Sequence, residues 1–361
     1  MERMAKVRGI LRDGFVYVEA DFDKLYRQGY GEIVDGSLEM HPLEASYLVW
    51  EQKMEVFDEN GKNISFEDLL TIMINDPATF LKYVVYSDLR RRSRLVVYER
   101  ATEFLRLYPK GASIGERASK QLILPLSEDQ PISHDQILAS LEKVMRLRKE
   151  LILAVVDDEM NVTYYEIEKF SPKPRESNLK DIPEKSGVLI GDRVLIFEDP
   201  SGLYSRGFWG HPIGIEKPEP FKDYEQPLQL PLIEALYLVS RGKLKVGNPK
   251  GNIIGLEELR KIFSGVRDNA EVKERVFSYW RDLGYIPKAG SKYGVDYMIY
   301  ERGPGLEHAP YLCIASDVRG KIKPIDLIRA GRLATSVRKE LVVSLVSGED
   351  ILSYKLRWFK P

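Results

Sequence analysis

Three side chains in the last fifth of the chain have the right types to cleave a phosphodiester bond without a metal ion. They are Tyr300, which ends a predicted strand, His308, which follows a Gly-Pro-Gly loop, and Lys339, which ends a predicted helix. A base can remove the proton of a ribose 2′-hydroxyl, an acid can protonate the departing 5′-oxygen, and a cation can stabilise the pentacoordinate phosphate. Histidine suits the acid role because its ordinary pKa is near neutrality. Each residue also has a structural interpretation. Tyr300 and His308 could be ordinary strand-end and loop residues, and Lys339 could interact favourably with a helix C-terminus.

Motifs for other common chemistries are absent from the sequence. Lys250-Gly251 lacks the spacing and the Ser or Thr of a phosphate-binding loop, and no Gly-x-Gly-x-x-Gly follows a predicted strand. There is no His-Glu-x-x-His or Gly-x-Ser-x-Gly segment, and four His with one Cys do not suit a structural zinc site. We therefore expect neither a metal ion nor a cofactor.

The elements that must position these residues occur twice, because the chain is internally duplicated. Four pairs of matching segments follow one another in the same order: Leu25–Tyr30 with Leu203–Phe208, Pro42–Val49 with Pro231–Val239, Val97–Arg100 with Ile299–Arg302, and Arg148–Leu151 with Arg338–Leu341. Repeats of this kind indicate a fused duplication. Between the copies, residues 171–185 are rich in Pro and charge, which is typical of a linker.

Each copy divides into two parts of mixed α/β (α+β) character. We expect an N-terminal α/β subdomain followed by a domain with a central mixed sheet flanked by helices. The expected boundaries are 1–75, 76–170, the linker 171–185, 186–266 and 267–361.

The last part of the chain illustrates the periodicity behind these assignments. An amphipathic helix is predicted over Glu271–Leu283, and strands are predicted over Asp296–Tyr300 and Tyr311–Ala315. A helix with Pro324 in its first turn is expected to end near Glu340. A hairpin of Leu341–Val346 and Ile351–Phe359 follows.

The duplication provides an internal comparison for the candidate catalytic residues. The first copy keeps Tyr98 and Lys149, but Arg106 stands eight residues after Tyr98, and no His lies in that loop. At an offset of 190, Arg332 corresponds to Glu142 and Trp358 to Glu168. A purely structural role does not predict that the differences gather at these positions.

Arg332 and Trp358 are candidates for binding RNA, because both present flat surfaces to an unstacked base. Arg332 lies two helical turns before Lys339, which would put the two cations on one helix face. Trp358 has an alternative interpretation as a core residue, since it shares a predicted strand face with Tyr354 and Leu356.

The overall charge balance hides a local excess. The chain has 54 Lys and Arg against 55 Asp and Glu, a net charge of −1 that by itself argues against a nucleic-acid partner. Residues 321–361, however, hold nine Lys or Arg and four acids, a local net charge of +5 that suits phosphate. A single Cys313, no signal-peptide pattern and no long apolar stretch favour a cytoplasmic protein without a membrane partner.

At these residues the sequence resembles the archaeal tRNA-splicing endonucleases, also called tRNA-intron endonucleases. The resemblance is carried by residues 292–308 (KYGVDYMIYERGPGLEH), residues 325–341 (IDLIRAGRLATSVRKEL) and Trp358, with weaker similarity over essentially the whole chain. It implies a nuclease-like fold for the second part of each copy. It also implies Tyr300 as general base, in preference to its rival Tyr297, His308 as general acid and Lys339 as transition-state stabiliser. One departure is Ala309, where many relatives have Ser.

The same resemblance implies a substrate, a set of products and a partner. The substrate would be precursor tRNA with a bulge–helix–bulge at the intron boundaries, cut at both splice sites to leave 2′,3′-cyclic phosphate and 5′-hydroxyl ends. No metal would take part, and no DNA is expected as a ligand. Arg332 and Trp358 would act across two subunits and sandwich a flipped bulge nucleotide.

A duplicated chain with one degenerate, non-catalytic copy resembles the homodimeric type of this family. The first copy's hairpin loop Asp157-Asp158-Glu159 would then dock into a basic cleft of the partner chain, although a solvated turn is an alternative. Two further hypotheses stay open: a non-catalytic RNA-binding or structural subunit of an endonuclease complex, and a metal-dependent nuclease.

Overall fold

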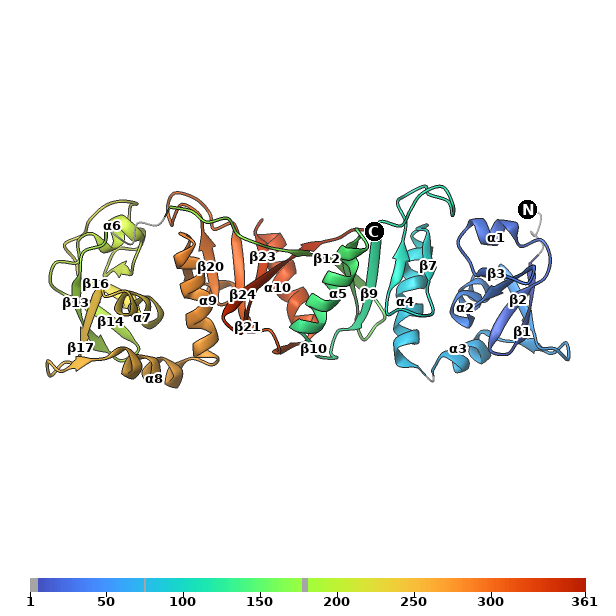
Figure 1. The fold of residues 1–361 in the computed structure, drawn as a ribbon, viewed down its shortest axis with the longest axis horizontal. Coiled ribbons are helices and arrows are strands. Elements are labelled where there is room, and N and C mark those ends of the chain that lie inside the picture. The colour runs from blue at the N-terminus through green and yellow to red at the C-terminus, as the bar shows by residue number, and fades with distance from the viewer. Residues whose placement is uncertain (1–5, 75, 177–180) are drawn as a thin grey trace.

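The two copies fold into the same succession of elements, arranged as four lobes in a row (Figure 1). The computed structural model describes residues 6–361 except 75 and 177–180. The N-terminal lobes lie at the two ends of the row, and the two C-terminal lobes meet at its centre. Part of the predicted linker, residues 177–180, lies outside the described residues. The prediction of a duplicated, mixed α/β chain is confirmed.

Each N-terminal lobe is a six-stranded sheet with three helices. In the first copy the elements are β1 (Val7–Arg12), β2 (Phe15–Val18), α1 (Asp23–Arg27), β3 (Glu32–Val34), β4 (Ser37–Met40), α2 (Pro42–Trp50), β5 (Met54–Phe57), β6 (Asn63–Ile64) and α3 (Phe66–Ile74). In the second they are β13 (Lys185–Ile190), β14 (Arg193–Ile196), α6 (Leu203–Gly207), β15 (His211–Pro212), β16 (Leu228–Pro231), α7 (Leu232–Ser240), β17 (Leu244–Gly247), β18 (Ile253–Ile254) and α8 (Leu256–Val266). The strand orders, β3-β4-β2-β1-β5-β6 and β15-β16-β14-β13-β17-β18, match element by element.

The C-terminal lobes also match one to one. The first contains α4 (Pro77–Arg91), β7 (Val96–Tyr98), β8 (Leu105–Leu107), β9 (Gln121–Ser127), β10 (Ile132–Ser133), α5 (His134–Arg146), β11 (Glu150–Val156) and β12 (Val162–Lys169). The second contains α9 (Ala270–Asp282), β19 (Ile286–Ala289), a 3₁₀ turn (Ser291–Tyr293), β20 (Tyr297–Tyr300), β21 (Tyr311–Asp317), β22 (Lys321–Ile322), α10 (Pro324–Ser336), β23 (Glu340–Ser347) and β24 (Asp350–Trp358).

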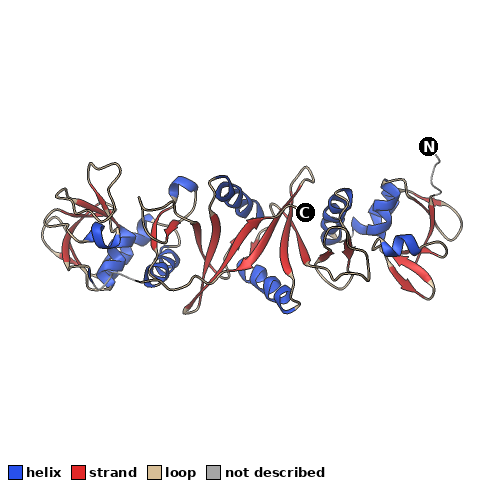
Figure 2. Cartoon of the chain, turned by 90° about the horizontal axis from the view of Figure 1, so that it is seen from above, coloured by secondary structure: helices blue, strands red, loops and turns tan. Residues whose placement is uncertain are grey.

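A single ten-stranded sheet joins the two C-terminal lobes, in the order β19-β20-β21-β23-β24-β12-β11-β9-β8-β7. Its strands run across the centre of the molecule (Figure 2). The copies meet where β12 pairs antiparallel with β24, and Ile167 opposite Leu356 is the pair nearest to the local two-fold axis. A second contact is the short pairing of β10 with β22.

Alternation along the strands assigns the helices to the two faces of this sheet. Leu151, Leu341 and their alternate neighbours pack in one cluster with α5 and α10. Ile152 and Val342 point the other way, and the clusters on that face include residues of α4 or α9. Both faces are therefore covered by helices, which explains why the central strands are almost continuously apolar.

Most predicted elements of the last part of the chain are confirmed, but one boundary is wrong. Helix α10 ends at Ser336 rather than near Glu340, because Arg338 adopts a left-handed conformation (φ 57°). Its N–H bonds back to Thr335 and the Lys339 N–H to Ala334, which is a Schellman ending. Lys339 therefore follows the helix, and it does not share a helix face with Arg332.

The strand register also corrects two correspondences between the copies. Arg106 pairs with Leu122 and Met298 with Leu312, so β8 is the counterpart of β20. Continuing this register by two residues places Tyr108, not Tyr98, at the position of Tyr300. In the last hairpin Val156 pairs with Val162, whereas Val346 pairs with Ile351. The second hairpin is one residue shorter, so Trp358 corresponds to Lys169 rather than Glu168.

The contact between the copies should weaken in mild acid through His134. Its Nδ1 lies 2.8 Å from the Tyr354 hydroxyl across the interface, and burial lowers its pKa from 6.5 to about 4. The unfolded chain therefore takes up this proton at a higher pH than the folded chain does. Stability from this group is complete above pH 6.5 and falls by about 3 kcal/mol as the pH drops from 6.5 to about 4.

The measurement is the free energy of unfolding against pH for the wild type and His134→Asn. We expect the variant to lose that part of the pH dependence while the contributions of other groups remain. Identical slopes for the two proteins between pH 6.5 and 4 would contradict the assignment.

Candidate active site

Tyr300, His308 and Lys339 lie at the same end of three neighbouring strands of the ten-stranded sheet, β20, β21 and β23. Tyr300 is the last residue of β20, and the pairing of Ile299 with Tyr311 sets it beside the start of β21. His308 lies in the loop that joins these two strands and is exposed. Lys339 immediately precedes β23, whose first residue is opposite Tyr311 in a parallel pair.

A direct contact fixes Lys339 beside the histidine loop. Its Nζ donates to the carbonyl oxygen of Ala309, the neighbour of His308, at 2.5 Å. One residue further along, the Glu340 N–H donates to the Pro310 carbonyl at 2.9 Å. The Schellman ending of α10 holds the Lys339 backbone, and the side chain is half-buried. The three predicted residues thus lie in or beside one loop of the second copy, and their catalytic roles stay a prediction.

The loop that carries His308 is held by a residue that the sequence did not single out. Glu307 Oε1 accepts hydrogen bonds from the backbone N–H groups of Glu301 and Arg302, both at 2.6 Å. A carboxylate that accepts two backbone bonds closes the loop on itself. Its position directly before His308 was the available signal.

The N-terminal lobe of the second copy supports the same loop from outside. A Cβ at Gly303 (φ 128°) would clash with the Phe208 ring, and one at Gly305 (φ 83°) would lie 2.9 Å from Pro220 Cγ. These close approaches and positive φ angles require glycine. The Gly-Pro-Gly spacing therefore reflects a backbone pressed against the neighbouring lobe.

Burial favours the neutral forms of both Tyr300 and Lys339. The pKa of Tyr300 is raised, mainly by burial and further by Tyr293 and the charge of Glu307. The pKa of Lys339 is lowered by burial. These directions follow from the cost of a charge in a poorly hydrated place.

The rival Tyr297 has a structural role. It is buried in the core on the opposite strand face, and its hydroxyl donates to the Lys273 carbonyl at 3.0 Å. Burial raises its pKa well above the ordinary value. Tyr300, which is half-buried, is the more accessible of the two phenols.

The first copy preserves the frame of the site without the imidazole. Lys149 Nζ donates to the Ser119 carbonyl at 2.7 Å, which repeats the contact of Lys339 with Ala309. At the same offset of 190, the residue in the place of His308 is Ala118. Tyr108, the counterpart of Tyr300, is buried.

Arg332 and Trp358 line one pocket of about 550 Å³ between the copies. Arg332 projects from α10 and donates to Thr163 Oγ1 of β12 at 2.9 Å. Trp358 is 54% exposed, although Tyr354 and Leu356 on the same strand face are buried. The core interpretation of Trp358 is therefore wrong, because β24 emerges from the core before its last residue.

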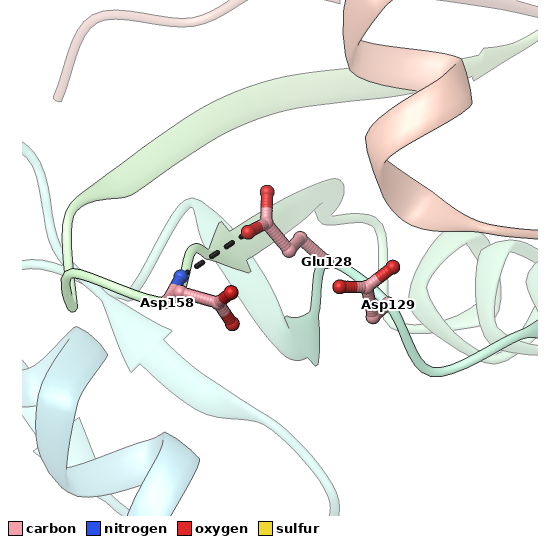
Figure 3. Close-up of side chains that lie close together, drawn as sticks. All are labelled: Glu128, Asp129 and Asp158. Atoms are coloured by element: carbon pink, nitrogen blue, oxygen red, sulfur yellow. Dashed lines mark hydrogen bonds between the residues drawn. The ribbon is translucent and has the colours of Figure 1, made fainter.

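The acidic loop after β11 lies beside two further carboxylates (Figure 3). The Asp158 N–H donates to Glu128 Oε1 at 3.2 Å, and Asp129 forms an ion pair with Lys323 at 2.9 Å. Glu128, Asp129 and Asp158 bring one oxygen each within 4.8 Å of one another. Among the residues that the structure describes, these three form the group that could share a cation, and all belong to the first copy.

Within the described parts of the chain, no helix is both long and apolar enough to span a bilayer. This finding agrees with the absence of a long apolar stretch in the sequence.

The comparisons with known proteins cover both copies. The model of the tRNA intron endonuclease catalytic C-terminal domain matches residues 79–164 and 270–354, and that of the N-terminal domain of the same family matches 7–70 and 185–260. A tRNA-splicing endonuclease of Methanococcoides burtonii is 30% identical over 351 residues, which cover 95% of this chain and 96% of the relative. That of Methanosarcina mazei is 34% identical over 337 residues, 91% of each chain.

A shorter relative supports the duplication. The tRNA-splicing endonuclease of Hyperthermus butylicus is 40% identical over 178 residues, which are 98% of its length but 48% of this chain. One copy of this chain thus has the size of a complete relative. The chain is therefore an RNA-cleaving enzyme of the tRNA intron endonuclease family.

Proposed function

We propose that the chain removes introns from precursor tRNA by cutting a bulge–helix–bulge at both splice sites. One observation carries the proposal: the second copy places Tyr300, His308 and Lys339 at the same end of three neighbouring strands, and the first copy has the same frame with Ala118 in place of the imidazole. A phenol, an imidazole and an ammonium can together support RNA cleavage without a metal ion.

In the proposed reaction Tyr300 takes the proton of the ribose 2′-hydroxyl, and the 2′-oxygen attacks the adjacent phosphorus. The bond from phosphorus to the 5′-oxygen breaks, and His308 donates a proton to that oxygen. The ammonium of Lys339 stabilises the charge on the pentacoordinate phosphate. The products are a 2′,3′-cyclic phosphate and a 5′-hydroxyl, and no metal ion takes part.

This chemistry also defines the ligand class. Because the attacking group is the ribose 2′-hydroxyl, DNA cannot be cleaved in this way. Arg332 and Trp358, which line one pocket, would sandwich a nucleotide flipped out of the bulge. We propose that this occurs across two subunits, in a cytoplasmic homodimer with two active sites.

The first copy would hold the dimer together through Asp157-Asp158-Glu159. Asp157 Oδ1 accepts the N–H groups of Glu159 and Asn161, so it shapes the loop, while Asp158 and Glu159 are exposed. An acidic tip of this kind complements a basic cleft. The alternative function, a non-catalytic RNA-binding or structural subunit, would not require the complete set around His308.

The central experiment is cleavage of an intron-containing precursor tRNA by the purified chain in EDTA. We expect full activity in the chelator and a loss on the order of 10²–10⁴-fold in the rate for His308→Ala, as for removal of a general acid. Activity that disappears in EDTA would refute the metal-free reaction. No cleavage by the wild type would favour the non-catalytic subunit.

A second test addresses the loop that positions His308. Glu307→Ala removes the acceptor of two backbone hydrogen bonds and should lower kcat by about tenfold or more through misplacement of the acid. Glu307→Gln keeps an acceptor oxygen and should retain most activity. Because the charge of Glu307 contributes to the raised pKa of Tyr300, the Gln variant should move the alkaline limb of the pH–rate profile to lower pH. Equal activity of the Ala variant and the wild type would dismiss this role.

A third test concerns the dimer. Exchange of Asp157, Asp158 and Glu159 for Ser should shift the sedimentation profile toward the monomer, because the acidic tip is lost. The matched control is the second copy's hairpin, in which Glu349 and Asp350 are changed to Ser and the profile should stay dimeric. An unchanged profile for the first variant would defeat the docking proposal.

A further inference from the structure

The pocket that holds Arg332 and Trp358 has walls from both copies. Beyond the pairing of Trp358 with Tyr165, the chain leaves β24, although the Phe359 N–H still donates to the Tyr164 carbonyl at 3.0 Å. The pocket lies where this pairing ends, and residues 162–165 and 358–361 are part of its lining. Because successive residues of β12 point to opposite faces, Tyr164 faces the side of α4 and Tyr165 the side of α10. The non-catalytic copy therefore contributes side chains to a pocket that contains the RNA-binding candidates.

The α4 wall presents a cation in a fixed orientation. Arg92, which caps the C-terminal end of α4, lines the pocket. Its Nε and one terminal nitrogen donate to the two oxygens of Asp88 at 2.8 and 3.1 Å. The Tyr164 hydroxyl donates to the same carboxylate at 2.6 Å. A two-pronged ion pair that is itself anchored pre-organises the guanidinium and leaves its other N–H groups for a ligand.

The opposite side of the local two-fold axis serves as an internal control. Backbone hydrogen bonds from Arg92 to Asp88 and from Leu283 to Tyr279 set the register of α4 against α9. Four side chains of the pocket and Asp88, the partner of Arg92, then correspond to five residues of another kind: Asp88 to Tyr279, Arg92 to Leu283, Tyr164 to Ser353, Arg332 to Glu142 and Trp358 to Lys169. If these residues only held the two copies together, we would expect similar residues on both sides of the two-fold axis. Among the described residues, the hydrogen bonds that join Arg92, Asp88 and Tyr164 have no counterpart at Leu283, Tyr279 and Ser353.

The positive charge of the pocket favours an anionic ligand. Arg92, Arg332 and Lys360 line it, and no acidic side chain does so among the described residues. Its volume of about 550 Å³ is within the range of small-ligand sites, about 300–1,000 Å³. A planar guanidinium with free N–H groups matches the oxygens of a phosphate.

We propose that Arg92 of the non-catalytic copy binds a backbone phosphate of the nucleotide whose base lies between Arg332 and Trp358. Asp88 and Tyr164 act as positioning residues that orient the guanidinium. This inference rests on the proposed RNA substrate. It gives the first copy a part in substrate binding as well as in architecture.

The test measures binding separately from cleavage. Fluorescence anisotropy of labelled precursor tRNA is recorded with His308→Ala protein, which leaves the RNA uncut, at several salt concentrations. Arg92→Ala in this background should raise Kd about tenfold and reduce the slope of log K against log[salt] by about 0.7, as for one lost phosphate contact on single-stranded RNA. Arg92→Lys should restore the salt slope and part of the affinity. The matched control is Arg91→Ala, the preceding exposed arginine of α4, which should bind within twofold of the parent.

A separate measurement tests the role of Asp88 and Tyr164 in positioning Arg92. Tyr164→Phe removes the bond to Asp88 and should raise Kd about threefold while the salt slope stays unchanged, because no charge is lost. Thermal unfolding should be measured alongside, and Arg92→Ala should unfold at the parent temperature.

The outcomes separate this inference from the proposed function. If Arg332→Ala weakens binding but Arg92→Ala does not, the role of Arg92 is overturned and the proposed function stands. Weaker binding with an unchanged salt slope would assign Arg92 a structural role and also overturn the phosphate contact. If the wild type leaves precursor tRNA intact, the proposed function fails, whereas the effect of Arg92 on binding is still measured.

Discussion

The antiparallel pairing of β12 with β24 is the interaction on which the rest of this structure depends. It converts two half-sheets into one sheet of ten strands and places Ile167 and Leu356 at the local two-fold axis. Because the side-chain period along a strand is two residues, the same register decides which residues meet α5 and α10 and which meet α4 and α9. A slip of one residue would move Tyr165 and Trp358 to the wrong faces, so the pocket between the copies is a direct product of this register.

A symmetric scaffold with asymmetric chemistry follows from that arrangement. The two copies retain the same element order and the same Schellman ending before Lys149 and Lys339. Duplicated packing surfaces constrain both copies equally, since each must cover its half of one sheet. The side chains proposed to touch the RNA are under no such constraint, and there the copies differ. Ala118 takes the place of His308, and Arg332 and Trp358 correspond to Glu142 and Lys169. We therefore base the proposed ligand contacts on the differences between the copies rather than on their similarities.

The sequence predicts the duplication, the mixed α/β class and the neighbourhood of Tyr300, His308 and Lys339, because periodicity and turn residues are local signals. Which residues of the two copies occupy equivalent positions depends on strand pairing, and similarity between short sequence segments does not reveal that pairing. The Tyr-Glu-Arg segments after Val97 and Ile299 are alike, yet they belong to different strands of the fold. The end of α10 was misplaced because Arg338 takes a left-handed conformation that normally favours glycine. The sequence does not single out Arg92, because its proposed role depends on Tyr164, which is distant in sequence, as well as on Asp88, one helical turn away.

The raised pKa of Tyr300 constrains how the site can act in the neutral range. A phenolate beside an imidazolium holds the same number of protons as a phenol beside an imidazole, so pH does not change the ratio of these two forms. Burial of Tyr300 and the charge of Glu307 set that ratio, and both favour the phenol. A rarer phenolate is also a stronger base, which partly offsets its scarcity during proton transfer. In the proposed reaction a phosphodiester beside Lys339 would shift its pKa in the opposite direction to burial, because the negative charge favours the ammonium form. A bound phosphodiester would thus counteract the effect of burial and raise the pKa of Lys339.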